Sequence, residues 1–226
     1  MDGAKRPLPD VQAALSALGR AAPRAEHCVN LPNRKLSGAD LMGFRLEGGD
    51  LSGAKFVAAD ISLCDIRHAE MTRADLTRAN LSRSRFVDVD FGGVTFEKAN
   101  LEAANFSRCN LSMAKLTDVV ARDARFSGSA LGGAKLSGNF NSCNFRSAEF
   151  TTSDLSELTV HGADFTGVSF EQANLDGADL SNPIGLTVEQ LIIAVLTDAT
   201  LLPEKIGNDP RIRDRIKRVA ELGEDA

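Results

Sequence analysis

The sequence has 226 residues and a mass of 24.1 kDa, which suits one domain of about 200 residues or two small ones. Its net charge of −5 and isoelectric point near 5.3 argue against a general nucleic-acid-binding protein, because such proteins present a basic face. The longest apolar run, Leu191–Leu196, is far shorter than the roughly 20 residues of a membrane-spanning helix, so no membrane association is expected.

The first segment, residues 1–30, is expected to form an N-terminal helical cap. Within it, residues 9–19 predict a short helix with one apolar face that Gly19 can end. That face consists of Val11, Ala14, Leu15 and Leu18. Residues 1–20 lack the apolar core of a signal peptide, so we expect a cytoplasmic protein.

From Leu36 onward, a large apolar residue returns at every fifth position. The series runs to Leu136, slips by one residue, and resumes from Phe140 to Leu180. Of these 30 central positions, 29 hold a large apolar residue, and the exception is Ala121. A small residue (Ala, Cys, Ser, Gly or Val) stands two positions earlier in 27 of the 30 units. The repeat is therefore far too regular to arise by chance.

A period of five residues fits extended chain and does not fit a helix. Five residues turn an α-helix by about 500°, so the central residues would form no stripe. On a strand, the small and the large residue of each unit point to the same side, and the following polar positions allow a turn. Such units bury a core only by stacking on one another. The repeat predicts a β-solenoid over residues 31–184.

The repeat resembles that of the pentapeptide-repeat proteins, whose pattern is Ala-(Asp/Asn)-Leu-x-x. The matching units include Ala39-Asp40-Leu41, Ala74-Asp75-Leu76, Ala79-Asn80-Leu81, Ala99-Asn100-Leu101, Ala163-Asp164-Phe165 and Ala178-Asp179-Leu180. The resemblance implies an all-β fold, a right-handed quadrilateral β-helix with four units per coil. Thirty units then make about 7.5 coils and, at ~4.8 Å per layer, a rod roughly 36 Å long.

Four units per coil place every fourth central residue on the same face of the rod. One face then carries a ladder of five stacked rings, which are Phe86, Phe106, Phe126, Phe145 and Phe165. The slip in the register falls at Ser137-Gly138-Asn139. We expect a tolerated deletion with a local kink there, and the alternative is a hinge.

The last segment, residues 185–226, is expected to form a C-terminal helical cap. Thr187-Val188-Glu189-Gln190 is a capping-box pattern that predicts a helix through about Leu196, and Asp209-Pro210 begins a second helix. The second helix carries a narrow apolar stripe, formed by Ile212, Ile216, Val219 and Leu222. This stripe either lies on the rod or pairs with a second copy of the chain, so it is the predicted homodimer contact.

No arrangement of residues typical of an enzyme is found in the sequence. The phosphate-loop, zinc-protease, serine-hydrolase and dinucleotide-binding motifs are all missing. Cys64, Cys109 and Cys143 occupy the small inward position, where a cysteine acts as a small apolar residue. We therefore expect a protein without catalysis, cofactor or metal.

Charge is unevenly distributed along the chain. Five arginines between Arg67 and Arg85 face only two acids, whereas Ser147 to Asp198 contains nine acids and no Lys or Arg. The predicted interaction surface consists of Glu149, Asp154, Glu157, Asp164, Glu171, Asp176 and Asp179.

Two explanations of this acidic half compete. Acids keep a repeat surface soluble, and the protein is then a structural scaffold or interaction module with an unidentified partner. The alternative comes from the resemblance, because well-known family members protect DNA gyrase and other type II topoisomerases from quinolones or similar toxins. Those members dimerise through C-terminal tails and present an acidic rod that mimics DNA. The resemblance thus implies a protein partner, gyrase, and no direct contact with nucleic acid.

Overall fold

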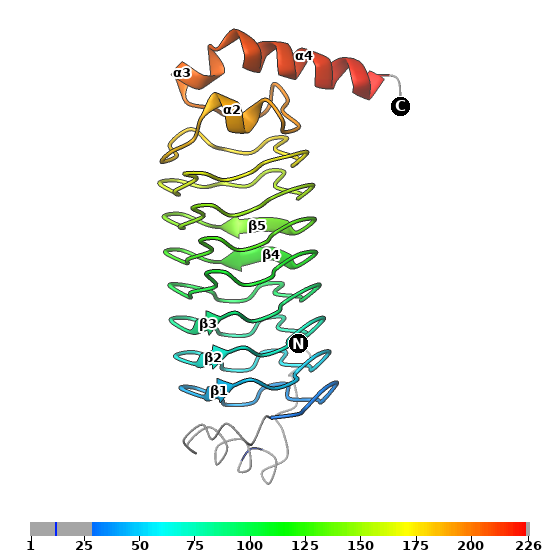
Figure 1. Ribbon diagram of the computed structural model, residues 1–226, viewed down its shortest axis with the longest axis vertical. Helices are drawn as coiled ribbons and strands as arrows, with labels where there is room; N and C mark the ends of the chain where they lie inside the picture. The colour runs from blue at the N-terminus through cyan, green and yellow to red at the C-terminus, as the bar shows by residue number, and fades with distance from the viewer. Residues whose placement is uncertain (1–11, 13–28, 225–226) are drawn as a thin grey trace.

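The computed structural model describes Gln12 and residues 29–224, which form a long rod (Figure 1). Its strands are short and parallel. β1 (Arg45–Glu47), β2 (Asp65–Arg67) and β3 (Arg85–Val87) form one sheet, and β4 (Lys115–Val120) and β5 (Lys135–Asn139) form another. Three helices follow at the C-terminal end, α2 (Val188–Leu191), α3 (Glu204–Gly207) and α4 (Pro210–Glu224).

Single parallel bridges join the coils wherever named strands do not. The first coil pairs with the second at four places, Asn30 with Asp50, Lys35 with Lys55, Asp40 with Asp60 and Arg45 with Asp65. A regular coil therefore has 20 residues and four faces, which we name A to D by their first central residues, Leu36, Leu41, Leu46 and Leu51. The predicted β-helical rod is confirmed, while its right-handed sense and its count of about 7.5 coils stay predictions.

The core consists of the central residues and the small residues two positions before them. The five phenylalanines of face C are at most 1% exposed. Their rings stack at centroid distances from 4.9 Å (Phe86 to Phe106) to 5.5 Å (Phe145 to Phe165), with planes within 15° of parallel. The predicted phenylalanine ladder is present. The thiols of Cys64, Cys109 and Cys143 are buried and free, as their place in the repeat predicts.

Most units end in a tight turn that closes one corner of the coil. In the first complete unit, the Ala39 N–H donates to the Leu36 carbonyl over 3.1 Å, across a Gly38 with φ of +66°. This left-handed backbone conformation suits glycine, yet 19 residues that are not glycine also adopt it, among them Leu63 and Arg73. Their side chains point outward at the corners.

The one-residue slip is absorbed at a single corner. β4 and β5 pair Leu116 with Leu136 but Val119 with Gly138, so the offset falls from 20 residues to 19. Gly138 adopts φ of +113°, and a side chain there would collide with the backbone of Val119. The bridges resume beyond it, from Asn139 to Thr159. This continuity favours the tolerated deletion over the hinge.

The parallel ladder continues past the predicted end of the solenoid at residue 184. Ile184, Val195 and Leu201 bridge to the coil below, so an irregular last coil contains α2. The capping box of Thr187 and Gln190 is confirmed, but α2 ends at Leu191, before the predicted Leu196, because residues 195 and 201 join the ladder. α4 begins at Pro210 as predicted, whereas α3 was not predicted.

The predicted N-terminal helix over residues 9–19 lies outside the described residues except for Gln12, which is helical. The Gln12 side chain contacts the first coil. Its Nε2 donates to the Asp40 carbonyl over 2.6 Å, and its Oε1 accepts from the Asp40 N–H over 3.0 Å. The amide of this one side chain therefore satisfies both backbone groups of Asp40.

Candidate functional site

Five of the seven predicted interface acids lie on two adjoining faces of the C-terminal coils. Face D carries Glu149 and Glu171, and face A with its following corner carries Asp154, Asp176 and Glu157. The remaining two, Asp164 and Asp179, lie on faces C and B. The structure therefore groups most of the predicted residues, because successive units of the repeat turn onto successive faces.

Three of these acids stabilise backbone turns in addition to carrying negative charge. The carboxylates of Asp154, Asp164 and Asp179 each accept from the backbone N–H two residues later, over 2.9 to 3.1 Å. They also lie close to a cationic or basic side chain, Lys135, Arg146 and His161, respectively. Carboxylates at this position of the repeat therefore hold the backbone of a turn as well as carrying surface charge.

These contacts shift the titration of the three groups. Burial raises the pKa of Asp154, but hydrogen bonds from Lys135 and Ser156 outweigh it, so the pKa is lowered overall. For Asp164, burial is likewise outweighed by hydrogen bonds from Thr166 and the charge of Arg146. The hydrogen bonds from Ser181 lower the pKa of Asp179. All three are carboxylates near neutral pH.

Three of the predicted interface acids are both exposed and unpaired, and these are Glu149, Glu157 and Glu171. Their side chains are exposed and form no hydrogen bond or ion pair with the described part of the chain. Asp176 is also exposed, but it accepts a 2.6 Å hydrogen bond from the Thr197 hydroxyl. The three glutamates therefore offer free negative charge on faces D and A.

Face D is acidic along the rest of the rod as well. Asp50, Glu70 and Asp90 stack on one another through parallel bridges, one coil apart. Arg73 is the only Lys or Arg at an outward position of this face in the described residues. Its guanidinium forms no ion pair with them, so one free cation interrupts an acidic surface.

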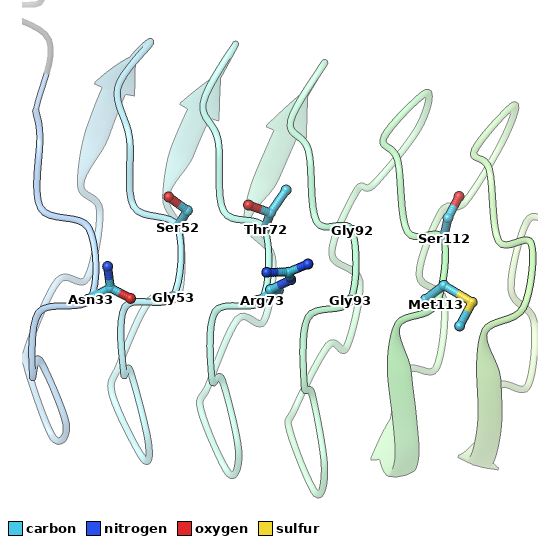
Figure 2. Close-up of a pocket in the computed structure, with 9 residues that line it drawn as sticks. All are labelled: Asn33, Ser52, Gly53, Thr72, Arg73, Gly92, Gly93, Ser112 and Met113. Atoms are coloured by element: carbon cyan, nitrogen blue, oxygen red, sulfur yellow. The ribbon is translucent and has the colours of Figure 1, made fainter.

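A shallow groove of about 900 Å³ surrounds Arg73 on face D. Figure 2 shows its lining in two rows that cross successive coils, Ser52, Thr72, Gly92 and Ser112 in one and Asn33, Gly53, Arg73, Gly93 and Met113 in the other. The hollow exists because glycine occupies both rows at Gly92 and Gly93. The repeat did not predict this groove, because it is lined by outward and corner positions, whose residues vary from unit to unit.

The five arginines between Arg67 and Arg85 form no common patch. Arg73, Arg78 and Arg83 are spaced by five residues, which places them at three successive corners of the coil. Arg67 is bound to Asp65 by two hydrogen bonds of 2.8 and 2.9 Å. The basic segment of the sequence is therefore spread around the rod.

The predicted dimer stripe is only partly accessible. Ile212 is 0% exposed, because α4 packs it onto the last coil, and it is not available to a second copy while α4 is docked. Ile216 and Val219 are half-buried, and Leu222 is 70% exposed. Figure 1 shows α4 lying across the rod end with its C-terminal half extending past the edge. Ile212 thus packs on the rod, which was one of the two alternatives for the stripe, and the dimer contact through the exposed end of α4 stays a prediction.

α4 is held on the rod by polar contacts as well. Arg215 donates to the Ala194 carbonyl over 2.7 Å, and Arg211 pairs with Glu189 over 3.0 Å. The helix also carries Arg213, Lys217 and Arg218. A basic helix therefore covers the end of the acidic coils.

No catalytic or metal-binding constellation is found among the described residues. None of their His, Cys, Asp and Glu side chains form a group of three or more placed to hold a metal ion. His68 lies between Glu47 and Asp88, at 3.7 and 3.8 Å, on an exposed corner. No helix in this part of the chain is long and apolar enough to cross a membrane. The adjacent residues His27 and Cys28, whose side chains are of metal-ligating types, lie outside the described residues.

Sequence comparisons assign the repeat. The family described as a pentapeptide repeat region matches residues 59–136, and the family of pentapeptide repeats (8 copies) matches residues 35–73 and 143–182. No curated protein sequence matches the chain.

Several solved structures resemble the rod. HetL, a pentapeptide repeat protein involved in heterocyst differentiation regulation from the cyanobacterium Nostoc sp. strain PCC 7120, is 19% identical, with coverage of 78% of this chain and 95% of HetL and a TM-score of 0.48. Full-length QnrB1, a plasmid-mediated fluoroquinolone resistance protein, is 17% identical, with coverage of 83% and 97% and a TM-score of 0.38. Neither likeness carries an argument about function.

Proposed function

Because this chain belongs to the pentapeptide-repeat proteins, we propose that it is a non-catalytic binding rod whose acidic C-terminal coils contact a cationic surface of a protein partner in the cytoplasm. The observation that carries this proposal is the free charge of Glu149, Glu157 and Glu171 on adjoining faces. The sequence between residues 147 and 198 contains no Lys or Arg, and Lys135, whose charge also acts on Glu157, is paired with Asp154.

The specific partner to test is DNA gyrase or another type II topoisomerase. A DNA-binding surface is cationic, and the complementarity that attracts phosphates also attracts carboxylates. A rod with acids on two adjoining faces then occupies the place of a DNA segment. The resemblance of the repeat to gyrase-protecting family members supports this choice and suggests protection from quinolones or similar toxins.

A gyrase supercoiling assay, with the protein titrated in the presence and absence of a quinolone, tests the partner. We expect inhibition of supercoiling, rescue from the drug, or both at micromolar or lower concentration. The triple variant Glu149→Lys, Glu157→Lys, Glu171→Lys should abolish the effect. These residues are better targets than Asp154, Asp164 and Asp179, whose carboxylates hold turns.

The matched control is Glu47→Lys, Glu97→Lys, Glu102→Lys, which changes the net charge equally in the N-terminal and middle coils. An effect that survives the C-terminal reversal, or is lost equally in the control, would rule out the acidic coils as the docking surface. An unaffected gyrase with folded protein would leave the alternative, a scaffold for another partner. That alternative predicts binding that competing DNA and added salt change little.

Dimerisation through the tail is part of the same proposal. The exposed end of α4, with Leu222 and Val219, is the apolar surface left for a second copy. Leu222→Glu should convert a dimer to a monomer in light-scattering measurements, because it places a charge in that contact. A wild-type chain that is monomeric at high concentration would remove this part of the proposal.

A further inference from the structure

We infer that the groove on face D binds an extended segment of the partner protein that carries one carboxylate, paired with Arg73, within an otherwise cationic sequence. This inference rests on the proposed function, since it describes what the acidic rod selects within a cationic partner. It concerns the N-terminal half of face D, several coils away from Glu149 and Glu171.

The Arg73 side chain lies in the groove between two glycines, and we call the backbone surface at these glycines the floor of the groove. Arg73 follows Gly53 and precedes Gly93 in the same corner column, so no neighbouring side chain covers it on either side. Its Cγ is 3.6 Å from where a Cβ at Gly93 would lie, so the aliphatic part of the side chain rests along that floor. The charged end is left at the surface for a ligand.

The surrounding acids do not neutralise Arg73. The Asp50 and Asp90 carboxylates accept the backbone N–H groups of Ser52 and Gly92 over 2.8 Å, and Glu70 accepts from the Thr72 hydroxyl. Arg73 therefore donates no side-chain hydrogen bond to the described residues, and its guanidinium keeps the planar arrangement of donors that matches a carboxylate.

This arrangement selects between cationic partners. The three acids beside the groove attract Lys and Arg side chains of a partner, whereas Arg73 repels a cation placed opposite it. A partner segment with one carboxylate opposite Arg73 and cations opposite the three acids matches every charge of the groove. A uniformly basic segment places a cation against Arg73. Arg73 thus acts as a specificity-determining residue through repulsion as well as attraction.

The groove also fixes where an apolar residue of the ligand lies. Met113 is 67% exposed at the far end of the groove, two coils from Arg73. At ~4.8 Å per layer this separation is about 9.6 Å, which an extended peptide spans in three residues at ~3.3 Å each. A flexible thioether suits an apolar side chain of loosely defined shape. The ligand therefore carries an apolar residue three positions from its carboxylate.

A display library of random 12-residue peptides, selected on the immobilised full-length protein, tests the inference. We expect enrichment of Lys- and Arg-rich peptides that share one Asp or Glu three positions from a large apolar residue. Arg73→Glu should replace the shared acid with Lys or Arg. The control, Arg83→Glu, changes an exposed arginine with the same left-handed backbone on another face and should leave the selection unchanged.

Each failure has a distinct meaning. Basic peptides without a shared acid, or an acid preference that Arg73→Glu leaves unchanged, would overturn the inference and leave the proposed function standing. Absence of any enrichment of basic peptides would contradict both. A second variant, Gly93→Gln, fills the floor without changing charge and should weaken binding of a selected peptide at least tenfold. Unchanged affinity for that variant would also overturn the inference.

Discussion

At the scale of single residues, the left-handed backbone at the corners lowers the stability of the fold wherever a residue other than glycine occupies it. Gly43 and Leu63 occupy the same corner on adjacent coils, with φ of +71° and +59°. A Cβ at Gly43 would meet no atom within 4 Å, so Gly43→Ala tests backbone strain alone. We expect a loss of about 1 kcal/mol of unfolding free energy in urea titrations.

The reverse change, Leu63→Gly, should stabilise the protein by about 0.5 kcal/mol, because relief of the strain exceeds the added entropy of the unfolded chain. Leu63 is exposed, so little apolar burial is lost with it. If Gly43→Ala proved as stable as the wild type, the left-handed corner would not carry the expected strain.

The five-residue pattern of the sequence predicts most of the core of the rod. The five-residue period assigns Phe126 to the core and Cys109 to the small position without any structure, because a β-helix repeats its geometry with the sequence. The role of Asp164 as a turn acceptor could not be found in this way. Its position is equally typical of a solvated acid, and the structure separates the two cases because the Thr166 N–H donates to its carboxylate.

At the scale of elements, Gln12 contacts the first described coil in the way that a preceding coil would. Elsewhere, Asp60 at the same position donates to the Ala39 carbonyl and accepts from the Leu41 N–H, both from the preceding coil. Gln12 supplies Asp40 with the corresponding acceptor and donor. A side-chain amide thus closes one site on the edge of the first coil.

Gln12→Ala should therefore expose the Asp40 backbone. We expect its amide to exchange hydrogen about fivefold faster, as the loss of a hydrogen bond worth about 1 kcal/mol implies. Gln12→Glu is the control, because a carboxylate keeps the acceptor for the Asp40 N–H and loses only the donor. Equal exchange rates in the wild type and Gln12→Ala would show that the contact does not protect this edge.

The phenylalanine ladder of face C should dominate core stability. Phe126 stacks between Phe106 and Phe145, at 5.3 and 5.2 Å, and is fully buried. Phe126→Ala should cost ~3–5 kcal/mol through lost burial and the cavity left between the two rings. Denaturant unfolding measures this loss, and Met42→Ala at an exposed position of face B should change stability by less than about 0.5 kcal/mol. An unchanged midpoint for Phe126→Ala would contradict the observed register.

The last coil shows where element prediction stops. The spacing of bridged residues grows from 20 at Ile184 to 21 at Val195 and 22 at Leu201, so the five-residue pattern no longer marks the core. Leu191 and Leu196 are nevertheless fully buried. A search for a fixed period could not include them, because the short helix α2 takes up the additional residues.

At the scale of the whole molecule, charge is ordered around the rod as well as along it. The sequence separates a basic segment from an acidic one, yet folding spreads Arg73, Arg78 and Arg83 over three corners. It also gathers acids from distant coils, such as Asp50 and Glu149, onto face D. The acidic faces and the groove thus follow from the 20-residue coil, which a linear count of charges does not contain.

The carboxylates of the rod should also make its stability depend on pH. Hydrogen bonds from Ser52, Arg67 and Ser181 lower the pKa of Asp50, Asp65 and Asp179, respectively. A carboxyl group with a lower pKa in the folded state stabilises the fold above its unfolded pKa, near 3.9, and this contribution is lost as the pH falls through the folded value. Urea midpoints should therefore be similar at pH 7 and 5 and fall below pH 4.

Asp164→Asn separates this effect from the turn itself. An asparagine can still accept from the Thr166 N–H, as Asn144 does from the Arg146 N–H over 3.0 Å, but it does not titrate. The variant should therefore lose less stability between pH 5 and pH 3 than the wild type does, while retaining the fold at both. A wild-type midpoint that stays constant down to pH 3 would mean that these carboxylates contribute equally to the folded and unfolded chains. The charge of these acids would then affect the binding of a partner to the surface of the rod, and it would not affect the stability of the fold.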